Sequence, residues 1–212
     1  PLARVMRLRH LAMTLSNLPS HPFREPALEQ YGTDGETAAR WLYSINSEEP
    51  FEDTNGIIDL GAGNGILGIG ALLLGAPNAI FVEIDEEVCK SLQEAIVSLN
   101  LGDRCRILNG DVRSINHDEI RRDIVVMNPP WGRQMPRADR PFLDTAVRCA
   151  NESIHLLHGR GAKHIESWAE SSGWFAKKWM EVDLPMPPIY SHHTKKRSTT
   201  EAAMWWIKRS AN

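Results

Sequence analysis

The glycine-rich segment at 59–65 constrains the fold of this chain more than any other feature. It reads DLGAGNG, follows the apolar pair Ile57-Ile58 and precedes a nearly all-apolar run at 66–74. A glycine-rich turn between a buried strand and a helix lets a ligand approach the backbone closely and points N–H groups at it. The spacing Asp-x-Gly-x-Gly-x-Gly differs from the dinucleotide fingerprint, which disfavours a nicotinamide cofactor. The residues of this turn that we expect to bind a cofactor are Asp59, Gly61, Gly63 and Gly65.

The rest of the chain alternates between strand and helix patterns, which predicts a mostly parallel sheet with helices on both faces. We expect one α/β domain in 212 residues, with a helical segment at 1–55 ahead of the core at 56–212. Trp205 and Trp206 are adjacent and must point to opposite faces, so the final strand should be inserted in the sheet. Strands are predicted at 56–60, 78–84, 104–108, 123–128, about 153–157, 175–184 and 201–208, and helices at 64–75, 86–100, 114–121, 141–151 and 162–171.

The segment before the first strand should contain two helices. Leucines near helical spacing predict one over 2–18, and three prolines then force an irregular connector. Thr33 is expected to cap the second helix, with Glu36 completing a capping box.

Acidic residues stand where successive predicted strands end. Glu83 ends the second strand and is placed to accept the hydroxyls of a ribose, with Ile84 beside it. Asp111, followed by Val112, stands after the third strand and resembles the residue that binds the amino group of a cofactor's adenine; a turn aspartate is the alternative reading. Asp85 is expected to cap the helix at 86–100.

The stretch Asn128-Pro129-Pro130-Trp131 follows the apolar strand at 123–127. The prolines restrict the backbone, so the Asn128 side-chain oxygen and the Pro129 carbonyl become two fixed acceptors. Such acceptors can hold a conjugated amine so that its lone pair points at an electrophile. The flat face of Trp131 is expected to support an unstacked base. A proline-rich turn with Trp131 as a packing residue is the alternative.

These motifs resemble those of the class I S-adenosylmethionine-dependent amino-methyltransferases. The resemblance implies a Rossmann-like fold with seven strands and a closing hairpin, S-adenosylmethionine as cofactor, and S-adenosylhomocysteine as product. It also implies that the catalytic residues are Asn128, Pro129, Pro130 and Trp131, with Asn128 contacting the cofactor as well.

The chain further resembles the methyltransferase-like protein five family, which methylates N6 of one adenosine in small-subunit ribosomal RNA. The similarity begins at 28–33 and 38–43, runs through the motifs above, and includes 142–146 and 191–198. It favours an archaeal member and implies that Gln30 and Thr33 hold the methionine end of the cofactor. It also implies a small zinc-binding activator of the Trm112 type, paired with an edge strand at 104–108. The family often has proline in place of Gly32 and phenylalanine or tyrosine in place of Trp131.

Composition agrees with a cytoplasmic enzyme. The three cysteines form no Cys-x-x-Cys pair, and we expect no bound metal. No apolar run approaches the ~20 residues that span a bilayer. The net charge of −3 hides basic patches that could contact RNA. The expected RNA-binding residues are Arg133, Arg137, Arg140, Lys195, Lys196 and Arg197.

Two other functions remain open from sequence. A glutamine N5-methyltransferase acting on a translation release factor uses a similar catalytic motif. It is expected to carry a separate helical domain ahead of the first motif, and it is disfavoured because 58 residues precede Asp59 and those at 30–33 are already assigned to the cofactor. A non-catalytic scaffold that binds the cofactor or RNA would not need the intact 128–131 motif.

Overall fold

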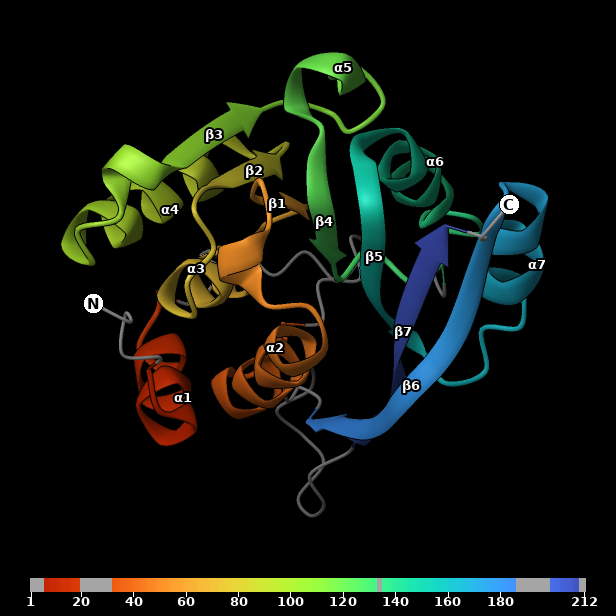
Figure 1. Ribbon diagram of the computed structural model, residues 1–212, viewed down its shortest axis with the longest axis horizontal. Helices are drawn as coiled ribbons and strands as arrows, with labels where there is room; N and C mark the ends of the chain where they lie inside the picture. Colours follow the sequence, from red (N-terminus) through yellow and green to blue (C-terminus); the bar gives the residue numbers. More distant parts are fainter. Residues whose placement is uncertain (1–5, 20–31, 133–134, 186–198, 210–212) are drawn as a thin grey trace, which may run out of the picture.

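The computed structural model describes residues 6–19, 32–132, 135–185 and 199–209. Within them, seven strands form one sheet in the order β3-β2-β1-β4-β5-β7-β6 (Figure 1). β7 is antiparallel to both of its neighbours, and the other described pairings are parallel. The predicted α/β fold with a mostly parallel sheet is therefore confirmed. The strands are β1 Ile57–Leu60, β2 Ala79–Glu83, β3 Cys105–Asn109, β4 Arg122–Met127, β5 Ala150–Gly159, β6 Trp174–Pro185 and β7 Thr199–Arg209.

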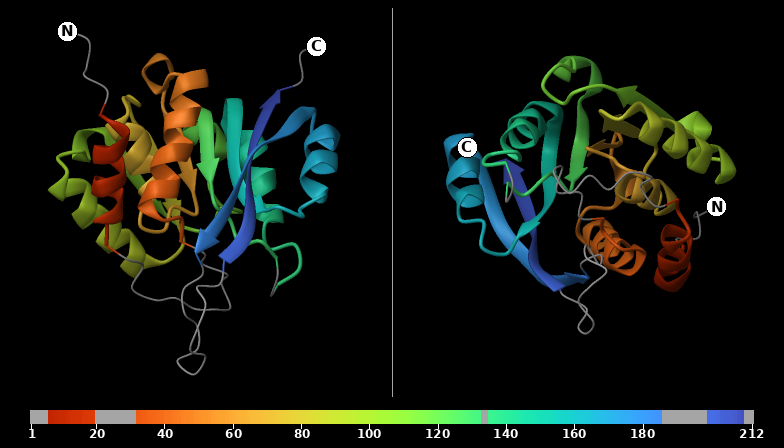
Figure 2. Two further views of the ribbon diagram at one scale, coloured as in Figure 1. Left: turned by 90° about the horizontal axis from the view of Figure 1, so that it is seen from below. Right: turned by 180° about the vertical axis from the view of Figure 1, so that it is seen from behind.

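Helices cover both faces of the sheet, and each face has its own apolar core. Leu15, Trp41 and Leu92 belong to the core of one face, and Leu143 and Trp168 to the core of the other. Figure 2 shows α1 and α2 side by side on the first face. The helices of the first face are α1 Leu8–Ser16, α2 Gly35–Glu48, α3 Ile66–Leu73 and α4 Glu86–Ser98; those of the second are α5 His117–Ile120, α6 Arg140–Cys149 and α7 His164–Ser171; short 3-10 turns are η2 Phe51–Asp53 and η3 Gly102–Arg104.

The central strands are apolar because both of their faces are covered. All residues of β1 and β2 are buried, as expected for parallel strands between two helical layers. No helix among the described residues has the length and apolar character needed to cross a bilayer.

β7 is inserted between β5 and β6, as the adjacent tryptophans predicted. Trp205 is buried in the core on the side of α7. Trp206 points to the opposite face, where it stacks on His155 with ring centroids 6.0 Å apart.

The predicted start of α2 is wrong by one residue. Asp34, not Thr33, is the N-cap, because the Asp34 side chain accepts hydrogen bonds from the backbone N–H groups of Glu36 and Thr37 at 3.1 and 2.9 Å. The Glu36 side chain completes no capping box with Thr33; it pairs with Arg40 at 2.7 Å. α1 is also shorter than the predicted helix at 2–18, of which residues 2–5 lie outside the described part. Asp85 caps α4 as predicted.

The sheet topology places the candidate site. From β1 the chain moves outward through β2 to β3, and then returns to pair β4 with the other side of β1. Open α/β sheets bind ligands at such a reversal, in a crevice beyond the carboxyl ends of the two central strands, so the site is expected there.

Candidate active site

Two loops leave the sheet at the same level on either side of this crevice. Leu60, the last residue of β1, is in register with Met127, the last residue of β4. The glycine-rich loop therefore begins beside the loop that starts at Asn128. The two sequence motifs that predicted the site are brought together by adjacent parallel strands.

The glycine-rich loop adopts backbone angles that favour glycine. Gly61, Gly63 and Gly65 have φ of 71°, 54° and 76°. Gly65 is the left-handed N-cap of α3, and a Cβ on Gly61 would lie 2.8 Å from the Phe142 ring. Every second residue of the loop is therefore a glycine, which leaves its backbone open to close approach by a ligand.

The Glu83 carboxylate organises this loop. Oε2 accepts a hydrogen bond from the Gly63 N–H at 2.9 Å. Oε1 accepts from the Ile84 N–H at 2.9 Å and from the Asp85 N–H at 3.0 Å. A carboxylate can accept further bonds, so the same group can fix the loop and hold ribose hydroxyls, the role predicted for Glu83.

Three other residues predicted to bind the cofactor, Ile84, Asp111 and Val112, have different surroundings. The Ile84 side chain is 64% exposed at the end of β2, which suits an apolar residue that packs against a planar ring. Asp111 accepts hydrogen bonds from the backbone and the guanidinium of Arg113, which lower the pKa of the Asp111 carboxyl to about 2. The carbonyl of the buried Val112 accepts from the Thr145 hydroxyl at 2.9 Å. Asp111 therefore forms a local turn, the alternative reading, and its predicted contact with an adenine amine stays a prediction.

Asp59 lies beneath the loop rather than in it. Its carboxylate accepts a hydrogen bond from the Gly68 N–H in α3 at 2.8 Å. Complete burial raises the pKa of Asp59 to about 8; the bond from Gly68 opposes this shift, and the charge of nearby Glu83 adds to it.

This raised pKa predicts a pH-dependent stability. Between the ordinary value of 3.8 and about 8, the folded protein holds a proton on Asp59 that the unfolded chain has released. The contribution of Asp59 is therefore complete below pH 3.8 and is lost as the pH rises toward 8, by up to about 1.4 kcal/mol per pH unit. We expect the free energy of unfolding of the cofactor-free protein, measured with urea at pH 6, 7 and 8, to fall less steeply with pH in Asp59→Asn. Equal slopes in the two proteins would contradict the assignment.

The Asn128 side chain is oriented from both ends. Its Nδ2 donates to the Thr33 hydroxyl at 3.2 Å, and its Oδ1 accepts from the Trp131 indole N–H at 3.2 Å. An indole nitrogen can only donate, so the Asn128 atom facing it must be the oxygen. The indole donor thus fixes the orientation of the Asn128 amide, and the buried Thr33 is bonded to the 128–131 motif rather than serving as the cap of α2.

Trp131 is less open than the sequence suggested. Its side chain is 6% exposed, packs within the core on the side of α2, and stacks on His158 with ring centroids 5.9 Å apart. Trp131 is therefore a packing residue in this conformation. Its predicted role as a platform for a base requires one ring face to become accessible and stays a prediction.

The residues predicted to bind RNA are only partly described. Arg137 and Arg140 are exposed beyond the catalytic motif, and the Arg140 guanidinium pairs with Asp144 at 2.9 Å. Gln30, Arg133, Lys195, Lys196 and Arg197 lie outside the described residues.

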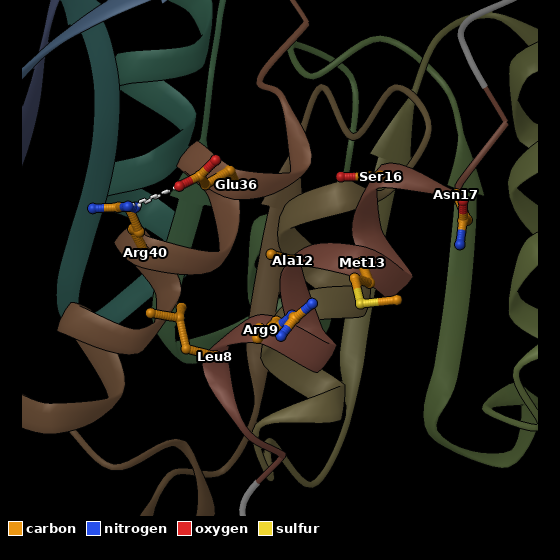
Figure 3. A pocket seen from close by; sticks show the side chains of 8 residues that line it. All are labelled: Leu8, Arg9, Ala12, Met13, Ser16, Asn17, Glu36 and Arg40. Carbon is orange, nitrogen blue, oxygen red and sulfur yellow. Dashed lines mark hydrogen bonds and ion pairs between the residues drawn. The ribbon is translucent and has the colours of Figure 1, made fainter.

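A surface groove of about 570 Å³ lies elsewhere, between α1 and α2 (Figure 3). None of its lining residues belongs to the predicted site, so this groove is not part of the site in the crevice. They are Leu8, Arg9, Ala12, Met13, Ser16, Asn17, Glu36 and Arg40.

Sequence reasoning missed a cluster beside Trp131. The side chains of Asp139, His158 and His164 meet there, and their ligand-type atoms all lie within 4.8 Å of one another. The three residues come from the start of α6, from β5 and from the start of α7. Their spacing follows no known motif, so no sequence signal would have grouped them.

The donors present fit S-adenosylmethionine. The glycine loop offers open backbone, and Glu83 offers a nearly buried carboxylate with unused acceptor capacity beside the exposed Ile84. The loop lacks the phosphate-binding spacing, which suits a cofactor with a sulfonium and an amino-acid tail. The fold and the site together define a class I S-adenosylmethionine-dependent methyltransferase.

Comparisons with known proteins give the family. The family model described as Conserved hypothetical protein 95 matches residues 42–156. The rRNA N(6)-adenosine-methyltransferase METTL5 of Danio rerio is 31% identical to this chain over 90% of this chain and 93% of its own length. This chain therefore belongs to the METTL5 family, as its motifs predicted.

Solved structures agree with this assignment. The crystal structure of PH1948 from Pyrococcus horikoshii, a candidate RNA methyltransferase, has a TM-score of 0.85 and 32% identity, covering 97% of this chain and 99% of that one. Magnesium protoporphyrin IX methyltransferase of Synechocystis PCC 6803, solved with bound S-adenosylmethionine, has a TM-score of 0.62 at 14% identity, covering 82% of this chain and 79% of that one. The second likeness concerns the fold alone.

Proposed function

We propose that this protein transfers a methyl group from S-adenosylmethionine to N6 of an adenosine in ribosomal RNA, and that this RNA belongs to the small subunit. The observation that carries the proposal is the oriented amide of Asn128, held by Thr33 and Trp131 beside the glycine-rich loop. Membership in the METTL5 family supports the same substrate.

The residues of the crevice have distinct tasks. Glu83, Ile84 and the glycine loop bind the cofactor, which supplies an electrophilic methyl group when bound. Asn128 Oδ1 has two lone pairs, so it can accept from Trp131 and from the adenine N6 amine together. With the Pro129 carbonyl, it holds the amine so that its lone pair points at the methyl carbon. Orientation of the two reactants supplies most of the acceleration, and the proton leaves N6 after the transfer.

The RNA is expected to approach over the exposed loop that follows Trp131, where Arg137 lies. The target adenosine leaves its stack and enters beside the cofactor. Arg133, Arg140 and the basic segment at 195–197 complete the proposed RNA contacts.

An activator of the Trm112 type completes the proposal. β3 is an edge strand of the described sheet, so its outer backbone groups can pair with a strand of another chain. The partner would extend the sheet beyond β3, away from the crevice.

Methyl transfer to RNA tests the function directly. We expect the protein, with a Trm112-type partner, to transfer labelled methyl groups to unmodified small-subunit rRNA, and mass spectrometry to place the label as N6-methyladenosine. A release factor offered in parallel should stay unlabelled. Label on a glutamine of the release factor would favour the glutamine methyltransferase, and binding of S-adenosylhomocysteine without transfer to either substrate would favour the scaffold.

A further inference from the structure

A buried carboxylate, Asp139, and two imidazoles, His158 and His164, form a cluster that contacts Trp131 of the 128–131 motif through His158. Asp139 Oδ2 is 2.6 Å from His164 Nε2 and 3.2 Å from His158 Nε2. Asp139 is 4% exposed and His158 is 3% exposed, whereas the His164 side chain is about half exposed. The cluster thus reaches from the surface at α7 to the interior at the end of β5.

The cluster touches the catalytic motif through one ring contact. The His158 ring stacks on Trp131 at an interplanar angle of 22°. Trp131 in turn donates to the oxygen of Asn128 that faces the proposed substrate. A continuous path of contacts therefore leads from Asp139 through His158 and Trp131 to Asn128.

The same cluster holds both ends of the loop that follows the motif. Trp131 begins this loop and Asp139 ends it, and both contact His158. Between them, Gly132 and Arg137 have φ of 75° and 65°. A left-handed conformation at a residue other than glycine persists only where the surroundings enforce it. Arg137 lies two residues before Asp139, one of the two anchored ends of the loop.

The distances favour hydrogen bonding over metal binding. Two ligands bonded to one tetrahedral zinc at ~2.0–2.1 Å lie roughly 3.3 Å apart. The 2.6 Å between Asp139 and His164 is shorter and suits an N–H donated to a carboxylate. Burial acts to raise the pKa of Asp139, but the contacts with His158 and His164 outweigh it and hold this pKa below its ordinary value. The carboxylate therefore stays charged. It accepts a hydrogen bond from His164, whereas His158 Nε2 is a close contact at 3.2 Å that lacks hydrogen-bond geometry.

We propose that Asp139, His158 and His164 form a clamp that positions Trp131, and through it the acceptor oxygen of Asn128, for methyl transfer. The three are positioning residues, since none touches the reacting atoms. The proposal rests on the proposed function but makes a separate claim about the orientation of Trp131.

Another buried histidine of β5 provides a matched control. His155 is fully buried, and its Nε2 lies 2.8 Å from Glu49 Oε2 at the end of α2. It contacts Trp206 and Trp179 rather than Trp131. Its loss should therefore weaken the fold without disturbing the catalytic motif.

Steady-state kinetics with the RNA substrate test the clamp. We expect His158→Ala and Asp139→Ala to lower kcat by about 10-fold or more, while the dissociation constant for S-adenosylhomocysteine changes less than about twofold. His158→Phe keeps a flat ring against Trp131 but loses the ring nitrogen that contacts Asp139, so its kcat should lie between those of His158→Ala and the wild type. In His155→Ala, the melting temperature should fall while kcat per folded protein stays at the wild-type value. Equal loss of kcat in His155→Ala and His158→Ala, or wild-type kcat in His158→Ala, would overturn the clamp.

A second readout does not need activity. The indole N–H resonance of Trp131, identified by its absence in Trp131→Phe, should shift or broaden in His158→Ala and stay in place in His155→Ala. An unmoved resonance in His158→Ala overturns the clamp. If the wild-type protein methylates no RNA, the proposed function fails. The spectrum still tests whether His158 positions Trp131, because it needs no methyl transfer. Elemental analysis adds one outcome: a stoichiometric transition metal that is lost in His158→Ala would replace the clamp with a metal site.

Discussion

Replacing Asn128 by alanine is expected to lower kcat for methyl transfer by at least about 100-fold, a loss comparable to removing one fixed polar group that stabilises a transition state. The substitution removes the oxygen that holds the amine and the nitrogen that bonds to Thr33. The glycine loop and Glu83 remain, so the affinity for S-adenosylhomocysteine should change little. Single-turnover methylation of RNA and calorimetry with S-adenosylhomocysteine measure the two quantities.

Asn128→Asp is the matched control for this prediction. Aspartate keeps an oxygen toward the Trp131 indole, and the Thr33 hydroxyl can rotate to donate to the second oxygen. We therefore expect Asn128→Asp to retain more activity than Asn128→Ala. Wild-type turnover in Asn128→Ala would refute the assigned role.

Replacing Glu83 by glutamine is expected to weaken cofactor binding by about 100-fold, or about 2.7 kcal/mol, because bonds to a charged acceptor are lost. Both carboxylate oxygens accept from backbone N–H groups, of Gly63 on one side and of Ile84 and Asp85 on the other. A glutamine amide has one oxygen, so its NH₂ group must face a backbone donor. The loop would then lose its anchor together with the group that binds the ribose.

Calorimetric titration with S-adenosylhomocysteine measures this effect. Glu87→Gln serves as the control, because the exposed Glu87 side chain pairs with Lys90 and, among the described residues, makes no contact with the glycine loop. Its affinity should match that of the wild type. Retention of full affinity by Glu83→Gln would mean that the ribose is held elsewhere.

The glycine-rich turn, the buried strands and the inserted final strand were predictable, because residues close together in the sequence determine each of them. The glycines at 61, 63 and 65 permit the left-handed backbone of the turn, and the apolar strands on either side of the crevice require two covered faces. The adjacent Trp205 and Trp206 forced an inserted final strand. These features depend on neighbours in sequence or on the period of a strand, and both are visible in a single chain.

Features that depend on distant partners were not predictable. Thr33 looked like a helix cap, yet its hydroxyl bonds to Asn128, 95 residues away in sequence, while Asp34 takes the cap. Trp131 looked like an open platform, but His158 covers one side of it. Each outcome follows from side chains that meet only after the sheet has formed, so local patterns contain no trace of them.

The position of β7 has a consequence for how the nascent chain folds. β6 joins the sheet only through β7, so the free edge of β5 stays unpaired until Thr199–Arg209 has left the ribosome. The five preceding strands can pair in order of synthesis, whereas the closing hairpin must dock afterwards and bury Trp205 and Ile207. Translation therefore passes through a stage in which β5, a long strand that is mostly buried in the folded protein, is open to mispairing with other chains, and the speed of the final docking step limits that exposure.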